Sequence, residues 1–280
     1  MLAFMADLME AVADLLLSAA QEIVLPVFGR AEAQPKLKSP GEWVTTADRD
    51  AEAVLGPALA ALVPGSVVVG EEAASANPGL LSCLRGADDV WLLDPVDGTG
   101  NFAAGRQPFA VMAAFQRDGE TVAAWILDPV SGRLATAQRG AGAWLDGNRV
   151  RTAPDVPELD QVRGAASRRF LPRALADHVK GAEPTFAALT RGTGCAGADY
   201  QAIGAGERDF ALYWRTLPWD HAAGVLFVTE AGGAAQRLDG TAYEAADYTR
   251  PGLLVTRNPG LWQPVRDRLM PGPLRELADG

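Results

Sequence analysis

The chain has 280 residues, of which 48% are apolar and 21% are charged, and these values exclude wholesale disorder. At about 150 residues per domain, this length predicts one large domain or two smaller ones. The formal net charge of −10 makes binding of nucleic acid or an anionic membrane through bulk charge improbable. We therefore expect a globular protein with no nucleic-acid partner and no membrane partner.

Histidine and cysteine are scarce, with two of each: His178, His221, Cys83 and Cys195. A zinc site of histidine and cysteine ligands is therefore nearly impossible to assemble, and a disulfide framework is excluded. The low cysteine count indicates a reducing compartment, and acids interrupt the apolar residues of the N-terminus, which argues against a signal peptide. The sequence contains no run of about 18 apolar residues, so we expect no membrane span. We expect a cytoplasmic protein whose chemistry relies on carboxylates, hydroxyls and hard metal ions.

Apolar periodicity predicts helices over residues 4–28 and 46–62, separated by a polar loop with two prolines at 30–43. Short apolar runs predict buried strands at 66–70 and 90–93. Asp-Gly and Ser-Gly pairs then separate further β segments. These segments are expected at 109–117, 121–127, 133–138, 144–145 and around Val150. The first half is therefore predicted to be two helices packed on an antiparallel sheet.

Residues 152–160 contain two prolines and three acids with little to bury, so we interpret them as the join between two halves. Strands and helices alternate after this join, which is typical of a layered α/β structure. The expected strands are 162–166, 209–214 and 253–256, and the expected helices are 172–179, 198–205, 220–231 and 260–269. The predicted organisation is an N-terminal α+β half over 1–151 and a C-terminal α/β half over 152–280.

The segment with the most chemical information is Leu93–Phe102, LDPVDGTGNF. Asp94 and Asp97 lie at the end of an apolar strand, Gly98 permits a tight turn, and Thr99 adds a hydroxyl. Hard divalent cations prefer oxygen ligands of this kind, and amides that follow a turn suit a phosphate oxygen. The segment therefore indicates a metal-assisted phosphatase site, provided that other oxygen ligands exist.

Two further acids lie at the ends of predicted elements. Glu71 follows the predicted strand 66–70, and Asp220 precedes an apolar helix. Asp220 is expected at the N-cap, close to the positive end of that helix. The residue after it, His221, is expected to point to solvent.

Other interpretations of the same segment are weaker. A β-turn with two solvated acids also explains Asp, Pro and Gly at these positions. A dinucleotide-binding fingerprint matches residues 98–103, but Gly105 and Pro108 leave only a turn or two for the helix that such a unit needs. Patterns typical of aspartyl-phosphate, C-x5-R and P-loop phosphatases are missing from the sequence.

Taken together, the motifs resemble those of the inositol monophosphatase family, which belongs to the magnesium-dependent, lithium-sensitive phosphatases. Its D-P-[VIL]-D-G-[TS]-x-N-F motif is intact as residues 94–102, and its W-D-x-x-A-[GA] motif occupies residues 219–224. Residues 70–72 (GEE) and 44–48 (VTTAD) match two further motifs in the family's order. The resemblance implies an α/β layered αβαβα sandwich like that of inositol monophosphatase and fructose-1,6-bisphosphatase. It also implies a homodimer.

The resemblance implies two to three Mg²⁺ ions as cofactors. Glu71, Asp94 and the carbonyl of Val96 would hold the first ion. Asp94, Asp97 and Asp220 would hold the second, with Asp94 bridging both. Glu71 would help to hold a weaker third ion through water.

The resemblance also implies how phosphate and water are held. Gly98 and Thr99 would offer backbone amides to the phosphate. Thr99 and Asp48 would orient the attacking water and, with Glu71, form the catalytic set. The implied activity is hydrolysis of a small phosphorylated metabolite by a metal-activated water.

The residues that select the substrate match the family less well. Tyr213 occupies a position where inositol-specific members have a glutamate that contacts a substrate hydroxyl. Gly194, Cys195 and Ala196 resemble the family's substrate loop only loosely. Four arginines of the second half are either solvated charges or a site for a second anionic group: Arg168, Arg169, Arg191 and Arg215.

Three activities therefore remain open. The resemblance favours a phosphomonoesterase similar to inositol-1-monophosphatase. The alternatives in the same superfamily are a histidinol phosphatase and a sugar or nucleotide (bis)phosphatase. An alternative of another class is a regulatory or RNA-associated protein on the same fold.

Overall fold

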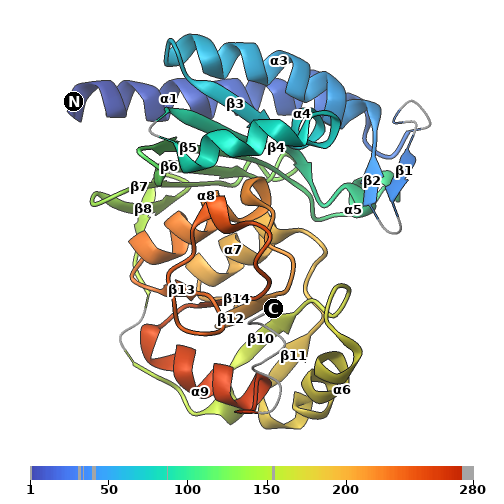
Figure 1. Ribbon diagram of the computed structural model, residues 1–280, viewed down its shortest axis with the longest axis vertical. Coiled ribbons are helices and arrows are strands. Elements are labelled where there is room, and N and C mark those ends of the chain that lie inside the picture. Colours follow the sequence, from blue (N-terminus) through green and yellow to red (C-terminus); the bar gives the residue numbers. More distant parts are fainter. Residues whose placement is uncertain are drawn as a thin grey trace.

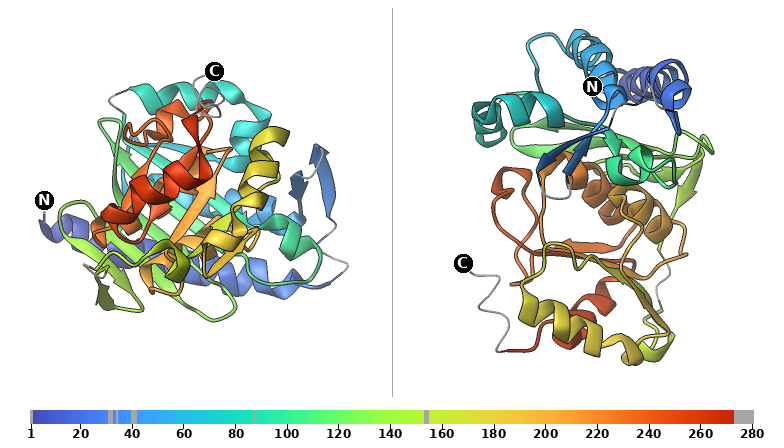
Figure 2. Two further views of the ribbon diagram at one scale, coloured as in Figure 1. Left: turned by 90° about the horizontal axis from the view of Figure 1, so that it is seen from below. Right: turned by 90° about the vertical axis from the view of Figure 1, so that its right-hand side faces the viewer.

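The computed structural model describes residues 2–30, 33, 35–39, 42–86, 88–152 and 155–272. Its elements stack in five layers, in the order helices, sheet, helices, sheet, helices (Figure 1; Figure 2, right). The predicted αβαβα sandwich is therefore confirmed. None of the described helices is both long enough and apolar enough to span a membrane.

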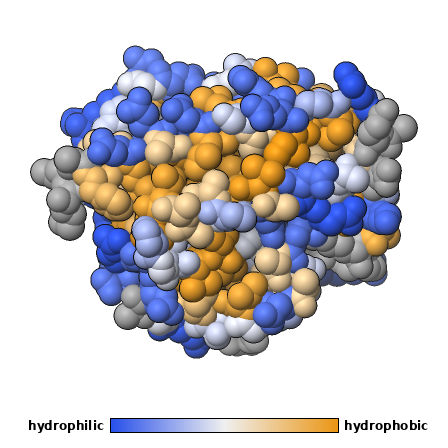
Figure 3. Space-filling view, turned by 90° about the horizontal axis from the view of Figure 1, so that it is seen from above, coloured by the Kyte–Doolittle hydropathy of each residue, from blue (hydrophilic) through white to orange (hydrophobic). Residues whose placement is uncertain are grey.

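The first layer consists of α1 (Leu2–Ala19) and α3 (Thr46–Leu62). A π-helical turn (Ala20–Val24) joins α1 to α2 (Leu25–Val27), so the predicted helix over 4–28 is interrupted rather than continuous. The inner faces of α1 and α3 bury aliphatic side chains against the sheet below. Their outer face also carries a band of apolar residues (Figure 3).

The predicted loop at 30–43 is wrong in part. Residues Lys36–Ser39 form strand β1 and Glu42–Val44 form β2, and the two pair antiparallel. Leu37 lies opposite Trp43, and such a cross-strand apolar pair stabilises a hairpin. The strands are too short for their alternation to stand out in the sequence. The rest of the loop prediction, at 31, 32, 34, 40 and 41, lies outside the described residues.

Among the described residues, the first sheet has seven strands in the order β3-β4-β5-β6-β7-β8-β9. Their bounds are β3 Val67–Gly70, β4 Val90–Asp97, β5 Ala110–Arg117, β6 Glu120–Leu127, β7 Leu134–Gln138, β8 Gly142–Leu145 and β9 Asn148–Val150. The expectation of a purely antiparallel sheet is wrong because β3 and β4 pair parallel. Their crossover contains α4 (Glu71–Ala76) and a 3₁₀ helix (Pro78–Arg85), neither of which was predicted.

The middle layer consists of α7 (Ala196–Gly204) and α8 (Pro218–Glu230). Both helices lie between the two sheets (Figure 1). At their crossing, a Cβ atom on Gly224 would lie 2.0 Å from Cδ2 of Tyr200, so only glycine fits there. One apolar core joins these helices to both sheets, with Ile126 of β6 and Val255 of β14 in the same cluster.

Within the described residues, the second sheet has five strands in the order β11-β10-β12-β14-β13. Their bounds are β10 Arg163–Ala166, β11 Ala188–Thr190, β12 Phe210–Tyr213, β13 Ala234–Gln236 and β14 Leu253–Thr256. β10 pairs parallel with β11 and β12, whereas β14 pairs antiparallel with β12 and β13. The two three-residue strands, β11 and β13, were not predicted. Helices α6 (Arg173–Gly181) and α9 (Pro259–Leu269) form the last layer. The boundary between residues 151 and 152 stays a prediction.

Candidate active site

A cavity of about 470 Å³ is lined by residues of both sheets and of the middle helices. Ten of the residues predicted for the site line it: Glu71, Asp94, Asp97, Gly98, Thr99, Gly194, Cys195, Ala196, Tyr213 and Asp220. Asp48 and Val96 lie behind this lining, and Thr99 contacts both. The size is within the range of small-molecule sites.

Asp94 and Asp97 both reach the cavity because β4 is irregular. Side chains three apart in a regular strand point to opposite faces of the sheet. The pairing of β4 with β5 shifts register between Asp94 and Asp97, at the point where Pro95 has no amide hydrogen to donate. Asp94 is held by a 3.0 Å hydrogen bond from the Val96 amide to its Oδ1. This irregularity brings two buried carboxylates to one side.

The carboxylate of Asp97 is anchored by the first turn of α7. The Gly197 amide donates to Asp97 Oδ2 at 2.6 Å, and the Cys195 thiol donates to the same oxygen at 3.1 Å. Burial raises the pKa of Asp97 to about 6, although these two hydrogen bonds oppose the rise. Sequence reasoning assigned Cys195 to the substrate loop and missed its contact with Asp97.

Thr99 lies between Asp48 and the main chain of β4. Its hydroxyl is 2.9 Å from the Val96 carbonyl and 3.2 Å from Oδ1 of Asp48. The other oxygen of Asp48 accepts hydrogen bonds from the amide and the hydroxyl of Thr45, which completes the capping box of α3. Burial raises the pKa of Asp48 to about 6. One Thr99 proton can serve only one of its two acceptors at a time.

Glu71 is the first residue of α4, directly after β3. The carboxylate of Glu52 accepts hydrogen bonds from the amides of Glu72 and Ala73, at 2.9 and 2.7 Å. Glu52 therefore fixes the start of the helix on which Glu71 lies. This residue was missed because nothing in the sequence of α3 distinguishes it from a solvated acid.

Asp220 does not occupy the predicted N-cap. Leu217 is the N-cap and Pro218 begins α8, so Asp220 lies inside the first turn. Proline is favoured at the first helical position, and it moves the helix start two residues upstream of the predicted one. The Asp220 carboxyl is hydrogen-bonded to Asp94. Burial is the main cause that raises the pKa of Asp220 to about 7, and the negative charge of Asp97 is the second. The positive charge of Arg215 opposes this rise.

The clustered acids have the chemistry of a cation site. Burial, followed by the charges of Glu71, Asp97 and Asp220, raises the pKa of Asp94 well above its usual range. Carboxylate and carbonyl oxygens are the ligands that hard divalent cations prefer. In the part of the chain that the structure describes, no three His, Cys, Asp or Glu side chains are already arranged around one point. Binding an ion would therefore require these side chains to turn toward it.

The expectation that His221 points to solvent is wrong. The ring is buried, with Nδ1 2.9 Å from the Tyr200 hydroxyl and Nε2 3.2 Å from the Arg215 carbonyl. Because a carbonyl only accepts, Nε2 carries the proton and Nδ1 accepts from Tyr200. Burial lowers the pKa of His221 to about 3. His221 is thus a neutral residue that fixes the backbone at Arg215.

The four arginines named from the sequence have different surroundings in the structure. Arg168 forms an ion pair with Glu183 and does not line the cavity. Arg169, Arg191 and Arg215 do line it. Sequence reasoning missed several other lining residues, since no motif marks them; Trp43, Arg106 and Phe170 are among these.

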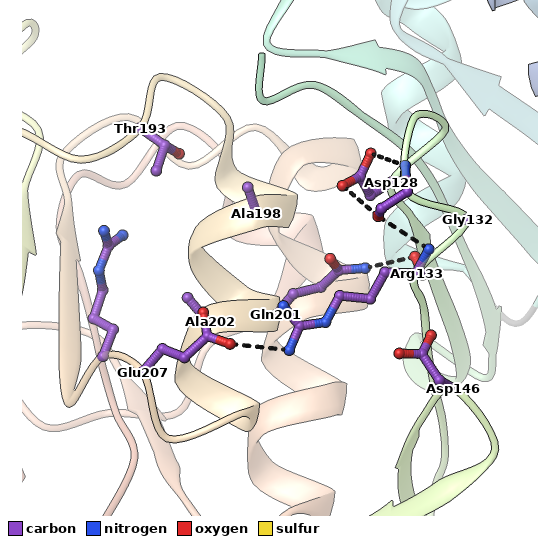
Figure 4. A pocket seen from close by; sticks show the side chains of 11 residues that line it. Asp128, Gly132, Arg133, Asp146, Thr193, Ala198, Gln201, Ala202 and Glu207 are labelled. Carbon is purple, nitrogen blue, oxygen red and sulfur yellow. Dashed lines mark hydrogen bonds and ion pairs between the residues drawn. The ribbon is translucent and has the colours of Figure 1, made fainter.

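A second cavity, of about 900 Å³, lies beside α7 and contains none of the clustered carboxylates (Figure 4). Arg133 forms a 3.2 Å ion pair with Glu207, and its carbonyl accepts from the Gln201 amide at 3.1 Å (Figure 4). Asp128 accepts from the Ser131 hydroxyl at 2.7 Å. Because these polar groups already satisfy one another, the first cavity is the candidate active site.

The layered fold and the acids gathered in one cavity are consistent with a phosphatase, and comparison with known proteins identifies the family. The chain belongs to the inositol monophosphatase family, whose model matches residues 5–268. It is 33% identical over 213 residues to an inositol-1-monophosphatase of Mesorhizobium japonicum, covering 74% of this chain and 76% of the relative. It is 31% identical over 232 residues to the Nus factor SuhB of Vibrio cholerae, covering 81% of this chain and 82% of the relative.

Solved structures show the same fold. An IMPase of Thermotoga maritima superposes with a TM-score of 0.79 at 23% identity, covering 94% of this chain and 96% of that one. The extragenic suppressor protein suhB of Bartonella henselae superposes with a TM-score of 0.77 at 26% identity, covering 94% and 99%. Membership of this family supports a phosphatase activity for the protein.

Proposed function

We propose that the protein is a Mg²⁺-dependent phosphomonoesterase that hydrolyses a small phosphorylated metabolite. The observation that carries this proposal is the set of carboxylates from three elements that line one cavity. Glu71 comes from α4, Asp94 and Asp97 from β4, and Asp220 from α8. Four acids in one cavity repel one another unless cations offset their charge.

The oxygen donors around Asp94 fit the proposed ions. Glu71, Asp94 and the Val96 carbonyl would hold one Mg²⁺, and Asp94, Asp97 and Asp220 a second. The contact between Asp94 and Asp220 supports their placement in one set of ligands. Glu71 would help to hold a third ion through water. Bound Mg²⁺ supplies a Lewis acid that offsets phosphoryl charge and lowers the pKa of water.

The main chain after β4 would hold the phosphate. Gly98 has φ +86°, and Thr99 begins the short helix α5 (Thr99–Ala103), so the amides of the turn are presented together. The Thr99 hydroxyl, with Asp48 behind it, would orient the attacking water and pass its proton to the Asp48 carboxylate. A pKa of about 6 suits Asp48 to accept a proton near neutral pH.

An inositol-1-phosphate-like ester is the substrate that the named relatives favour. The leaving group would face Gly194, Cys195, Ala196 and Tyr213, which line the same cavity. Histidinol phosphate and sugar or nucleotide (bis)phosphates are the alternatives.

Hydrolysis of a panel of phosphate monoesters, with Mg²⁺ and with a chelator, tests the function. Chelation should abolish the activity. Asp94→Asn and Asp220→Asn should lower kcat by about a hundredfold or more, because each removes a ligand charge. Asp128→Asn, in the second cavity, is the matched control and should retain activity. Undiminished hydrolysis in either ligand variant would refute the site.

A regulatory role like that of a Nus factor is the second candidate, since several relatives carry the name Nus factor SuhB. The complete set of carboxylates argues against vestigial catalysis, and the net charge of −10 argues against direct RNA binding. Purified protein that hydrolyses no ester with Mg²⁺ would favour this candidate. A homodimer, testable by light scattering, and a cytoplasmic location stay predictions.

A further inference from the structure

Arginine side chains contribute to the lining of the candidate active site. Four arginines line the cavity that holds the clustered carboxylates: Arg106, Arg169, Arg191 and Arg215. They come from the loops that follow α5, β10, β11 and β12. Four separate segments thus bring guanidinium groups to one small cavity.

Three of these arginines have no anionic partner in the part of the chain that the structure describes. Within the described residues, no ion pair joins Arg106, Arg169 or Arg191 to a carboxylate. By contrast, Arg133 at the second cavity is paired with Glu207 (Figure 4). An anion from outside the protein is therefore the natural partner of the three.

Phe170 organises part of this arginine group. The guanidinium carbons of Arg169 and Arg215 lie 4.9 and 4.3 Å from the centre of its ring. A guanidinium held on an aromatic ring keeps its N–H groups available for two-pronged contacts with phosphate. Arg215 also interacts with Asp220, which leaves Arg169 the better placed of the two for a ligand.

Apart from the proposed metal ligands, one described carboxylate lines the cavity, and it already has partners in the protein. Asp199 also lines the cavity, but it forms an ion pair with Arg208 and accepts a hydrogen bond from the Thr193 hydroxyl. Tyr213 is 8% exposed, and its hydroxyl has no hydrogen-bond partner among the described residues. Arginines without a described partner in this cavity favour a ligand with anionic oxygens over a neutral polyol, and the Tyr213 hydroxyl offers such a ligand one further donor.

The geometry points to a substrate with two phosphate groups, in which Arg169 and Arg191 hold the phosphate that is not cleaved. This inference rests on the proposed phosphatase function and specifies its substrate class. Water adds its hydroxyl to the phosphorus at the carboxylate end, the P–O ester bond breaks, and the leaving oxygen takes a proton. The products are inorganic phosphate and a monophosphate that the arginines retain.

Matched substrate pairs test this inference with the Mg²⁺-loaded protein. Fructose 1,6-bisphosphate is compared with fructose 1-phosphate, and 3′-phosphoadenosine 5′-phosphate with adenosine 3′-phosphate. We expect kcat/KM to be about tenfold or more higher for the bisphosphate of at least one pair. Arg169→Gln combined with Arg191→Gln should lower that ratio by about tenfold, mainly through KM. Arg173→Gln, an exposed arginine of α6, is the control and should leave the ratio unchanged.

Product inhibition gives a second measurement. Fructose 6-phosphate should inhibit competitively and fructose should not, and the double variant should lose most of this inhibition. Equal kcat/KM within both pairs, or a double variant that keeps the wild-type ratio, would overturn the inference while leaving the phosphatase proposal standing. Failure to hydrolyse any ester would instead overturn the proposed function.

Discussion

The backbone amide of Gly197 lies 2.6 Å from Oδ2 of Asp97 and ties the start of α7 to the end of β4. A Cβ atom on Gly197 would lie 2.8 Å from the Cβ of Ala110, so the close approach requires glycine. Cys195 reinforces this connection, since its thiol donates to the same oxygen and its sulfur accepts from the Ala198 amide at 3.4 Å. The conformation of Asp97 thus depends on a segment that also lines the substrate side.

Cys195→Ala should weaken Mg²⁺ binding and lower stability by about 1 kcal/mol, because the N-cap acceptor and one donor to Asp97 are both lost. Cys195→Ser should retain most of both, since a hydroxyl donates and accepts at the same position. The measurements are the Mg²⁺ concentration for half-maximal activity and urea unfolding. Cys83→Ala is the control, because its thiol donates to the Leu80 carbonyl, away from the site. Equal Mg²⁺ requirements in the alanine and serine variants would contradict the prediction.

Gly224→Ala should destabilise the protein by about 1–3 kcal/mol, because the added methyl group overlaps the ring of Tyr200. Gly56→Ala in α3 makes the same change where the new Cβ lies 3.9 Å from Val68. That variant should gain about 0.5–1 kcal/mol from the lower entropy of the unfolded chain and better helix propensity. Thermal unfolding of both variants measures the contrast. A Gly224→Ala protein as stable as wild type would show that the helices move apart without cost.

His221 should make stability fall as the pH drops below about 6.5. Its pKa is about 3 in the folded protein and near 6.5 in an unfolded chain, so the unfolded state binds more protons between these values. His221→Gln removes this effect and should reduce the slope of unfolding free energy against pH by up to about 1.4 kcal/mol per pH unit. Urea unfolding across pH 4 to 7 measures it. Parallel slopes in the two proteins would indicate an exposed ring.

Mg²⁺ should stabilise the protein more at high pH than at low pH. In the metal-free state, the pKa values of Asp48 and Asp97 are raised to about 6 and that of Asp220 to about 7. These acids then bind more protons in the folded state than in the unfolded state between about pH 4 and 7, so their contribution to metal-free stability falls as the pH rises through this window. Metal binding requires the deprotonated acids.

The difference in Tm between Mg²⁺-loaded and chelator-treated protein measures this effect at about pH 5 and pH 8. The rise in Tm caused by Mg²⁺ should be several degrees larger at about pH 8 than at about pH 5. Asp220→Asn should reduce it, because one of the proposed ligands is removed. An increment that does not change with pH would mean that the ion binds elsewhere.

Local signals in the sequence were sufficient to predict most of the long helices and strands and the layered α/β class of the fold. The apolar run of β4 and the Asp94–Phe102 motif were visible because their information lies within ten neighbouring residues. The hydrogen bond from Gly197 to Asp97 joins positions 100 residues apart, so nothing local predicts it. The start of α8 was misplaced because a favourable Asp at position 220 competes with Pro218 for the helix start. His221 was misjudged because its burial depends on the neighbouring layers, and for the same reason the sequence left the role of Arg168 open.

The packing of helix α8 also determines which residues of the site are held by the same sheet. It follows the join in sequence, yet it packs on β4 to β8 of the first sheet. Packing therefore links Asp220 to the sheet that carries Asp94 and Asp97, whereas Arg169 and Arg191 lie on loops that follow strands of the second sheet. A small hinge motion between the layers would change the reach from the carboxylates to the arginines and leave the spacing among the carboxylates intact. Leaving groups of different length could thus be accommodated without disturbing the reacting end.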